Sequence, residues 1–74
     1  MELVPVDSSM ITAIGYDPTI RELEIAFSSG RIYRYTDMPL DVYEGLLAAE
    51  SKGQYMHAYV LDVYNYYPVS RRRR

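Results

Sequence analysis

The stretch LEIAFSSGRIYRY, residues 23–35, decides the fold that we predict for this chain of 74 residues. Apolar and polar side chains alternate on both sides of residues 28–30, which is typical of half-buried β-strands. Residues 28–30 are Ser-Ser-Gly, and such residues form turns. The stretch therefore predicts a β-hairpin with one apolar face.

The register of this hairpin follows from the length of its loop. A two-residue loop would place Glu24 opposite Tyr35, whereas a three-residue loop with Gly30 at a positive φ places Glu24 opposite Arg34. The second register forms a cross-strand ion pair on the solvent side and sets Tyr33 and Tyr35 on the inner face. We therefore predict the three-residue loop.

A third strand is predicted before this hairpin. Apolar residues recur at every second position from Ile11 onward, and Asp17 and Pro18 then form a turn. The loop around them has four or five residues, and its length decides whether Ile14 or the pair of Ile11 and Ala13 faces inward. The sequence leaves these two alternatives open. The three strands form an antiparallel meander.

Two helices are predicted after the strands. Pro39 suits the first turn of a helix whose apolar stripe runs from Val42 to Leu47. Residues 51–54 (Ser-Lys-Gly-Gln) form a capping box for a second helix, which Asn65 ends before an extended segment that packs on the sheet edge. The predicted fold class is α+β, a three-stranded antiparallel β-meander packed on a C-terminal two-helix hairpin.

The charge of the chain is unevenly distributed. Eight Lys and Arg stand against ten Asp and Glu, for a net charge of −2, but four of the eight are Arg71–Arg74. Residues 1–70 therefore have a net charge of −6 and form one acidic domain, while residues 71–74 form a basic tail that we expect to be disordered. The chain has no Cys and no apolar run long enough to span a bilayer, so we expect a cytoplasmic protein without membrane contact.

The order of several short motifs resembles the KTSC domain, a family named for its occurrence at the C-terminus of some lysyl-tRNA synthetases. The resemblance covers about residues 6–69, so residues 1–70 are interpreted as a single KTSC-like domain. Two positions depart from the family pattern: Met38 stands where Val is usual before Pro, and His57 stands where Asn is common. The matching motifs are Ser8-Ser9, Ile14-Gly15-Tyr16-Asp17-Pro18, Phe27, Gly30, Tyr33-Arg34-Tyr35, Met38-Pro39, Val42-Tyr43, Ala48-Ala49-Glu50-Ser51-Lys52-Gly53, Tyr64 and Tyr66.

The resemblance implies a small bacterial or phage protein, but it implies no established activity. Because of the occurrence in synthetases, it favours weak RNA binding by a non-catalytic module. The basic tail supplies the charge that a nucleic acid needs. The candidate RNA-binding residues are Arg31, Arg34, Lys52, Tyr64, Tyr66, Arg71, Arg72, Arg73 and Arg74.

The nine tyrosines allow a second hypothesis, a protein-interaction or self-association module. A core of this size does not readily satisfy so many phenols, and we expect Tyr64, Tyr66 and Tyr67 to be exposed. Tyr33 and Tyr35 could stack on bases, but the predicted register favours a place in the core. An exposed sheet face with Ala26 and Ile32 would also favour protein contacts.

Catalytic and metal-binding functions are poorly supported by the sequence. His57 is the only histidine, and no nucleophile motif accompanies Ser8 or Ser9. No pair of ligands has metal-binding spacing, so we predict no enzyme, no metal, no cofactor and no small-molecule substrate. A weak anion site at Ser51 and Gly53, where the second helix begins, is a further but less favoured interpretation.

Overall fold

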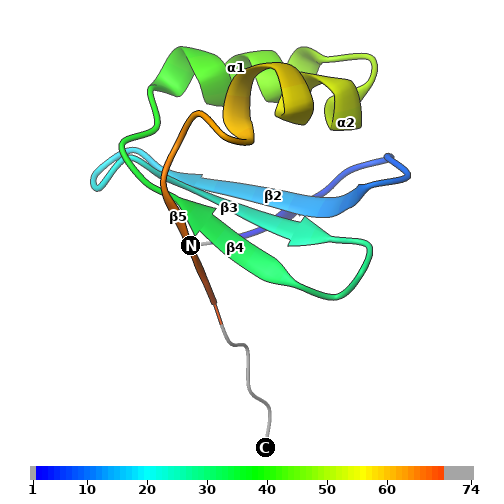
Figure 1. The fold of residues 1–74 in the computed structure, drawn as a ribbon, viewed down its shortest axis with the longest axis horizontal. Coiled ribbons are helices and arrows are strands. Elements are labelled where there is room, and N and C mark those ends of the chain that lie inside the picture. The colour runs from blue at the N-terminus through cyan, green and yellow to red at the C-terminus, as the bar shows by residue number, and fades with distance from the viewer. Residues whose placement is uncertain (1, 70–74) are drawn as a thin grey trace, which may run out of the picture.

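The computed structural model describes residues 2–69. The predicted disordered tail, residues 71–74, lies outside this range. The chain forms a sheet with a layer of helices on one side (Figure 1). The elements in chain order are β1 (Val4–Pro5), β2 (Ile11–Asp17), β3 (Glu22–Phe27), β4 (Ile32–Tyr35), α1 (Leu40–Ala48), α2 (Lys52–Tyr55), the π-helical turn η1 (Met56–Val60) and β5 (Tyr66–Pro68).

The sheet confirms the predicted α+β class but corrects its details. It has five strands in the order β1-β2-β3-β4-β5, and all neighbours are antiparallel. The prediction of three strands was wrong because β1 and β5 are too short to show an alternating pattern. The helices lie between β4 and β5, so they are not C-terminal.

The predicted β3–β4 register is confirmed. Glu24 pairs with Arg34, and Gly30 has a φ of 99° in the three-residue loop. The ion pair also forms, with Arg34 Nε 2.8 Å from Glu24 Oε1. Its predicted position on the solvent side was wrong for Glu24, whose exposed fraction is 0 %. Ala26 and Ile32, on the same outer face, are half-buried rather than exposed.

A β-bulge in β2 resolves the two alternatives for the first strand. Ile11 pairs with Phe27 and Ala13 pairs with Ala26, so Thr12 is an extra residue in β2. The extra residue reverses the alternation of side chains, and Ile11 and Ile14 both become fully buried. Neither alternative was complete, because both assumed an uninterrupted period of two.

Pro39 and Ser51 mark the starts of the two helices. Pro39 is the N-cap of α1, and the Ser51 hydroxyl accepts a hydrogen bond from the Gln54 N–H, which confirms the predicted second helix start. After α2 the helix widens into η1, where the Leu61 N–H donates to the Met56 carbonyl over 2.7 Å. Such π-helical turns are rare and often occur at functional sites.

The core lies between the helices and the inner face of the sheet. Within residues 2–69, none of the helices has the length and the apolar composition of a membrane-spanning helix. The buried apolar residues come from both layers and from the turn before α1: Ile11, Ile14, Leu23, Ile25, Tyr35, Met38, Leu46, Met56 and Val60.

Both edge strands contain a proline. The Val6 N–H donates to the Thr12 carbonyl, and the Val69 N–H donates to the Ile32 carbonyl. In an antiparallel ladder the residues beside such pairs point their main-chain groups away from the partner strand. Pro5 and Pro68 occupy these outward positions. The predicted extended segment on the sheet edge is thus confirmed as β5.

Candidate binding cleft

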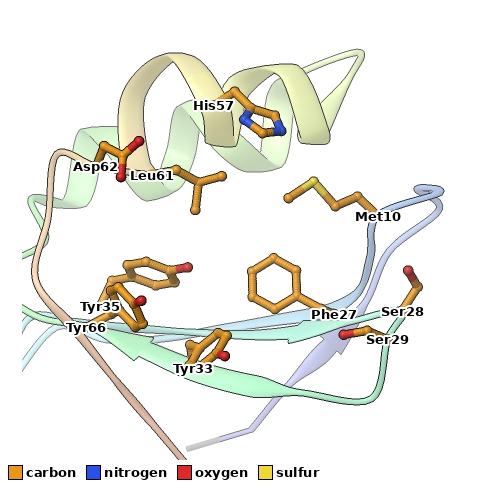
Figure 2. A pocket seen from close by; sticks show the side chains of 10 residues that line it. All are labelled: Met10, Phe27, Ser28, Ser29, Tyr33, Tyr35, His57, Leu61, Asp62 and Tyr66. Atoms are coloured by element: carbon orange, nitrogen blue, oxygen red, sulfur yellow. The ribbon is translucent and has the colours of Figure 1, made fainter.

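A cavity of about 490 Å³ opens between η1 and one end of the helix-facing side of the sheet. Figure 2 shows aromatic rings from the sheet on one side of it and side chains from η1 and its flanks on the other. The cleft is lined by Met10, Phe27, Ser28, Ser29, Tyr33, Tyr35, His57, Leu61, Asp62 and Tyr66.

Four aromatic rings form a continuous floor. Ring centroids are 5.8 Å apart for Phe27 and Tyr33, 5.1 Å for Tyr33 and Tyr66, and 5.5 Å for Tyr35 and Tyr66. Their order follows from the sheet, since Tyr35 pairs with Tyr66 across β4 and β5. Tyr66 is 58 % exposed, whereas Tyr35 is 2 % exposed. The floor therefore extends from the core to the surface.

The roof of the cleft combines apolar and polar side chains. Figure 2 shows Met10 and Leu61 facing the aromatic floor, with His57 above them. His57 belongs to η1, and the wide π-helical turn continues directly into Leu61 and Asp62. A flat group between floor and roof would meet apolar atoms on both sides, as ligands do in most small-molecule sites.

The two ends of the cleft are polar. Asp62 lies at the end formed by Tyr35 and Tyr66, while Ser28 and Ser29 lie at the opposite end, in the β3–β4 loop (Figure 2). The backbone of Asp62 has a φ of 64°, in the left-handed region that few residues other than Gly adopt. No residue of the range 2–69 donates a hydrogen bond to its carboxylate.

A cation stands beside the floor. The Arg31 guanidinium donates a hydrogen bond to the Tyr33 hydroxyl, with Nη1 3.4 Å from that oxygen. This hydrogen bond raises the pKa of Arg31 above its usual value. Burial raises the pKa of Tyr35 to about 12, so that phenol stays neutral at physiological pH. The site thus presents one cation, aromatic rings and one carboxylate.

The structure brings together only part of the predicted RNA-binding set. Tyr66 lines the cleft, and Arg31 is hydrogen-bonded to Tyr33, which also lines it. Tyr64 is half-buried and packs against the core, although we expected it to be exposed. Tyr66 and Tyr67 are exposed as predicted. The four arginines of the tail lie outside the described residues.

Arg34 and Lys52 lie elsewhere and are bonded within the protein. Arg34 is on the outer face of the sheet, where it contacts Glu24 and also Glu22, with Nη1 3.3 Å from Glu22 Oε1. The hydrogen bond to Glu24 raises the pKa of Arg34 above its usual value. Lys52 Nζ donates to the carbonyls of Leu47 and Ala49 at the junction of the helices. At the start of α2, where the sequence suggested a weak anion site, the Gln54 N–H already donates to the Ser51 hydroxyl.

Sequence reasoning missed most of the lining. Tyr35 lies in the core as expected, and Tyr33 is half-buried and packs against the core, but both rings also line the cleft. Phe27, Met10 and Asp62 carried no signal, because each comes from a different segment that only the fold brings together. The inward tyrosines of β4 beside a returning Tyr-rich segment were the one available clue.

His57 has no catalytic setting in the described part of the chain. It is exposed, and within residues 2–69 it forms no hydrogen bond with a serine or a carboxylate. Within residues 2–69 no group of three His, Cys, Asp or Glu side chains could hold a metal ion. The arrangement suits non-covalent binding of a flat group.

The fold defines a small α+β domain with a cleft on the helix-facing side of its sheet, and comparison with known proteins identifies its family. The family model of the KTSC domain matches residues 7–66, and the chain belongs to that family. A crystal structure of a KTSC domain protein from Yersinia pestis has the same fold, with a TM-score of 0.91 and 32 % sequence identity. The alignment covers 93 % of this chain and 97 % of that one.

Relatives occur both as small proteins and as segments of a large one. A protein of Tsukamurella paurometabola is 45 % identical over 56 residues, which are 76 % of this chain and 84 % of the relative. A lysine–tRNA ligase of Nostoc sp. is 41 % identical over 68 residues. Those residues are 92 % of this chain but only 12 % of the ligase, so the similarity concerns one segment of that protein.

Proposed function

We propose that this KTSC domain is a non-catalytic module that binds single-stranded RNA by taking an unpaired base into the cleft. The observation that carries the proposal is the aromatic floor of Phe27, Tyr33, Tyr35 and Tyr66, which reaches the surface beside Arg31. A base stacked on an aromatic side chain contributes about 1–3 kcal/mol, and every base has a face that can stack. The Arg31 guanidinium stands where it can contact the phosphate of the same nucleotide.

The basic tail supports the same ligand. The Val69 N–H is bonded to the Ile32 carbonyl, next to Arg31, and the four arginines follow two residues later. The rest of the chain has a net charge of −6, which opposes a polyanion. Attraction of RNA therefore depends on the tail and Arg31. Four phosphate contacts with a single strand give a slope of log affinity against log salt of about −3.

The relatives favour RNA over DNA. The similar segment in Nostoc belongs to a protein named as a lysine–tRNA ligase, which acts on tRNA. This supports RNA as the nucleic acid, although the small relative of Tsukamurella carries no such name.

The test compares two tyrosines of equal exposure. Tyr66 in the cleft is 58 % exposed and Tyr59 on the helical layer is 57 % exposed. Fluorescence anisotropy with a labelled oligouridine of about eleven nucleotides measures the affinity of the full chain and of Tyr66→Ala and Tyr59→Ala. We expect Tyr66→Ala to weaken binding by about 5- to 160-fold, because one stack is lost, and Tyr59→Ala to leave it unchanged.

Removal of residues 71–74 is the second arm of this test. We expect a weaker affinity and a flatter salt dependence between about 50 and 200 mM salt. Absence of binding at the lower salt concentration, or equal losses for the two tyrosine variants, would contradict the proposal. Circular dichroism checks that each variant is folded.

A second candidate function, self-association or binding of another protein, is favoured by one observation. Tyr59 and Val63 are 57 % and 61 % exposed, so η1 and the turn after it present two large apolar side chains to solvent. Light scattering of the full chain and of Val63→Lys tests it. A concentration-dependent dimer that Val63→Lys dissociates is the expected result, and a monomer over the whole concentration range contradicts self-association.

A further inference from the structure

We infer that the cleft selects guanine, with the base directed at Asp62 and the phosphate at Arg31. This inference rests on the proposed binding of single-stranded RNA. Two opposite charges lie at the cleft: the Asp62 carboxylate is at one end, and the Arg31 guanidinium is bonded to Tyr33 of the floor. Such a distribution of charge orients a nucleotide, whose phosphate is anionic and whose base is neutral.

The position of the two charges follows from the sheet. Asp62 lies near the ring pair of Tyr35 and Tyr66, which is where β4 ends and β5 begins. Arg31 precedes β4 and is bonded to Tyr33. The length of β4 therefore separates them, and a base on the aromatic floor lies between them.

The carboxylate of Asp62 is available to a ligand. The residue is exposed, lines the cleft, and receives no hydrogen bond from residues 2–69. Its positive φ results from the tight turn after η1, where the Val63 and Tyr64 N–H groups both donate to the Val60 carbonyl. A backbone held in this region is pre-organised, so only the side chain of Asp62 has to be ordered when the ligand binds.

A carboxylate distinguishes guanine from the other bases by its hydrogen-bonding edge. It accepts hydrogen bonds and donates none. Guanine presents two adjacent donors, N1–H and the exocyclic amino group, which match two carboxylate oxygens. Uracil has one N–H between two carbonyls, and adenine and cytosine place an acceptor nitrogen beside the amino group. Only guanine can therefore pair with both carboxylate oxygens of Asp62 without placing a hydrogen-bond acceptor of the base next to one of those oxygens.

The same carboxylate excludes the reverse orientation. A phosphate next to Asp62 would be repelled, whereas at the Arg31 side it meets a cation and lies close to Val69, after which the basic tail follows. Hydrogen bonding to the base and placement of the phosphate thus favour one orientation. In this arrangement Asp62 determines specificity, while stacking and the arginines supply most of the affinity.

The test uses the full chain and three RNAs: an oligouridine, the same RNA with one central guanosine, and the same RNA with one central adenosine. We expect the guanosine RNA to bind about tenfold more tightly than the other two, which corresponds to about 1.4 kcal/mol. Asp62→Asn should bind all three RNAs alike, because its amide presents a donor as well as an acceptor.

Asp37→Asn is the matched control. Asp37 is also exposed and has a φ of 54°, but it does not line the cleft. It should retain the guanosine preference of the unmodified chain. Equal binding of all three RNAs by the unmodified chain, or loss of the preference in both variants, would overturn this inference and leave the proposed function intact. Binding of none of the RNAs would instead contradict the proposed function.

Discussion

Tyr35 connects the core of the domain with its cleft. It is 2 % exposed, pairs with Leu23 on one side and Tyr66 on the other, and also lines the cavity. Burial, followed by the neighbouring phenols of Tyr66 and Tyr33, raises its pKa to about 12 from a usual value of 10.0. The folded state therefore holds the proton of Tyr35 more tightly than the unfolded state does.

This difference predicts a loss of stability in alkaline solution. Below pH 10 both states keep the proton, so Tyr35 adds no pH dependence there. Between about pH 10 and 12 only the unfolded state loses it, and the free energy of unfolding falls by up to about 2–3 kcal/mol. Urea unfolding at several pH values should show a smaller fall for Tyr35→Phe than for the unmodified chain. Parallel pH profiles of the two proteins would refute the assignment to Tyr35.

At the scale of the elements, a polar cluster on the outer face connects β3, β4 and β5. Arg34 of β4 contacts Glu24 and Glu22 of β3, and the Tyr67 hydroxyl of β5 donates to Glu22 Oε1 over 2.7 Å. This hydrogen bond raises the pKa of Tyr67. The three-residue strand β5 carries Tyr66 into the cleft, so the cluster on one face supports the site on the other.

We predict that Arg34→Met is strongly destabilising. It leaves the fully buried Glu24 carboxylate without its guanidinium, and loss of one partner of a buried ion pair costs about 3 kcal/mol or more. Arg31→Met is the control, because Arg31 is exposed and its guanidinium bonds only to the Tyr33 hydroxyl among the described residues. It should change the free energy of unfolding by less than about 1 kcal/mol. Equal effects of the two substitutions would show that Glu24 does not depend on Arg34.

The elements also show what the sequence could predict. The β3–β4 register was predictable because cross-strand charge, apolar alternation and Gly30 all favoured the same loop. The bulge at Thr12 was not, because an extra residue in a strand leaves no mark in the composition of that strand. The widening of the second helix into η1 was likewise not predictable, because it is a change in the backbone hydrogen bonds that no residue type indicates.

At the scale of the whole molecule, the helices and the sheet share one small core. Leu46 is fully buried between the two layers, whereas its neighbour Leu47 is 39 % exposed. A domain of this size is stabilised by only about 3–5 kcal/mol. The packing of single side chains therefore decides whether the chain is folded.

The adjacent leucines provide a direct comparison. Replacement of a buried leucine by alanine costs about 2–5 kcal/mol, so we predict that Leu46→Ala is largely unfolded at 25 °C in circular dichroism. Leu47→Ala should stay folded, with a loss below about 1 kcal/mol. A cooperative thermal transition for Leu46→Ala close to that of Leu47→Ala would contradict the assigned core.

The candidate site was less predictable than the fold because its residues converge only in three dimensions. Charge alone identified Arg31, and the surplus of tyrosines identified Tyr66, but the same criteria also selected Arg34 and Lys52, which bond within the protein. The charge of a residue does not indicate on which face of the fold its side chain lies. The aromatic floor depends on which face of the sheet each side chain occupies. That face is determined by the register of the strands, which the sequence specified for only one hairpin.

The prolines of the two outermost strands limit how copies of this domain can assemble. An additional strand, from another copy or from a peptide, would have to pair with the free edge of β1 or β5, where Pro5 and Pro68 offer no N–H. Growth of the sheet into a continuous intermolecular β-structure is therefore disfavoured at both ends. Association through a face of the domain or through the cleft, where side chains rather than main-chain groups make the contacts, is not limited in this way.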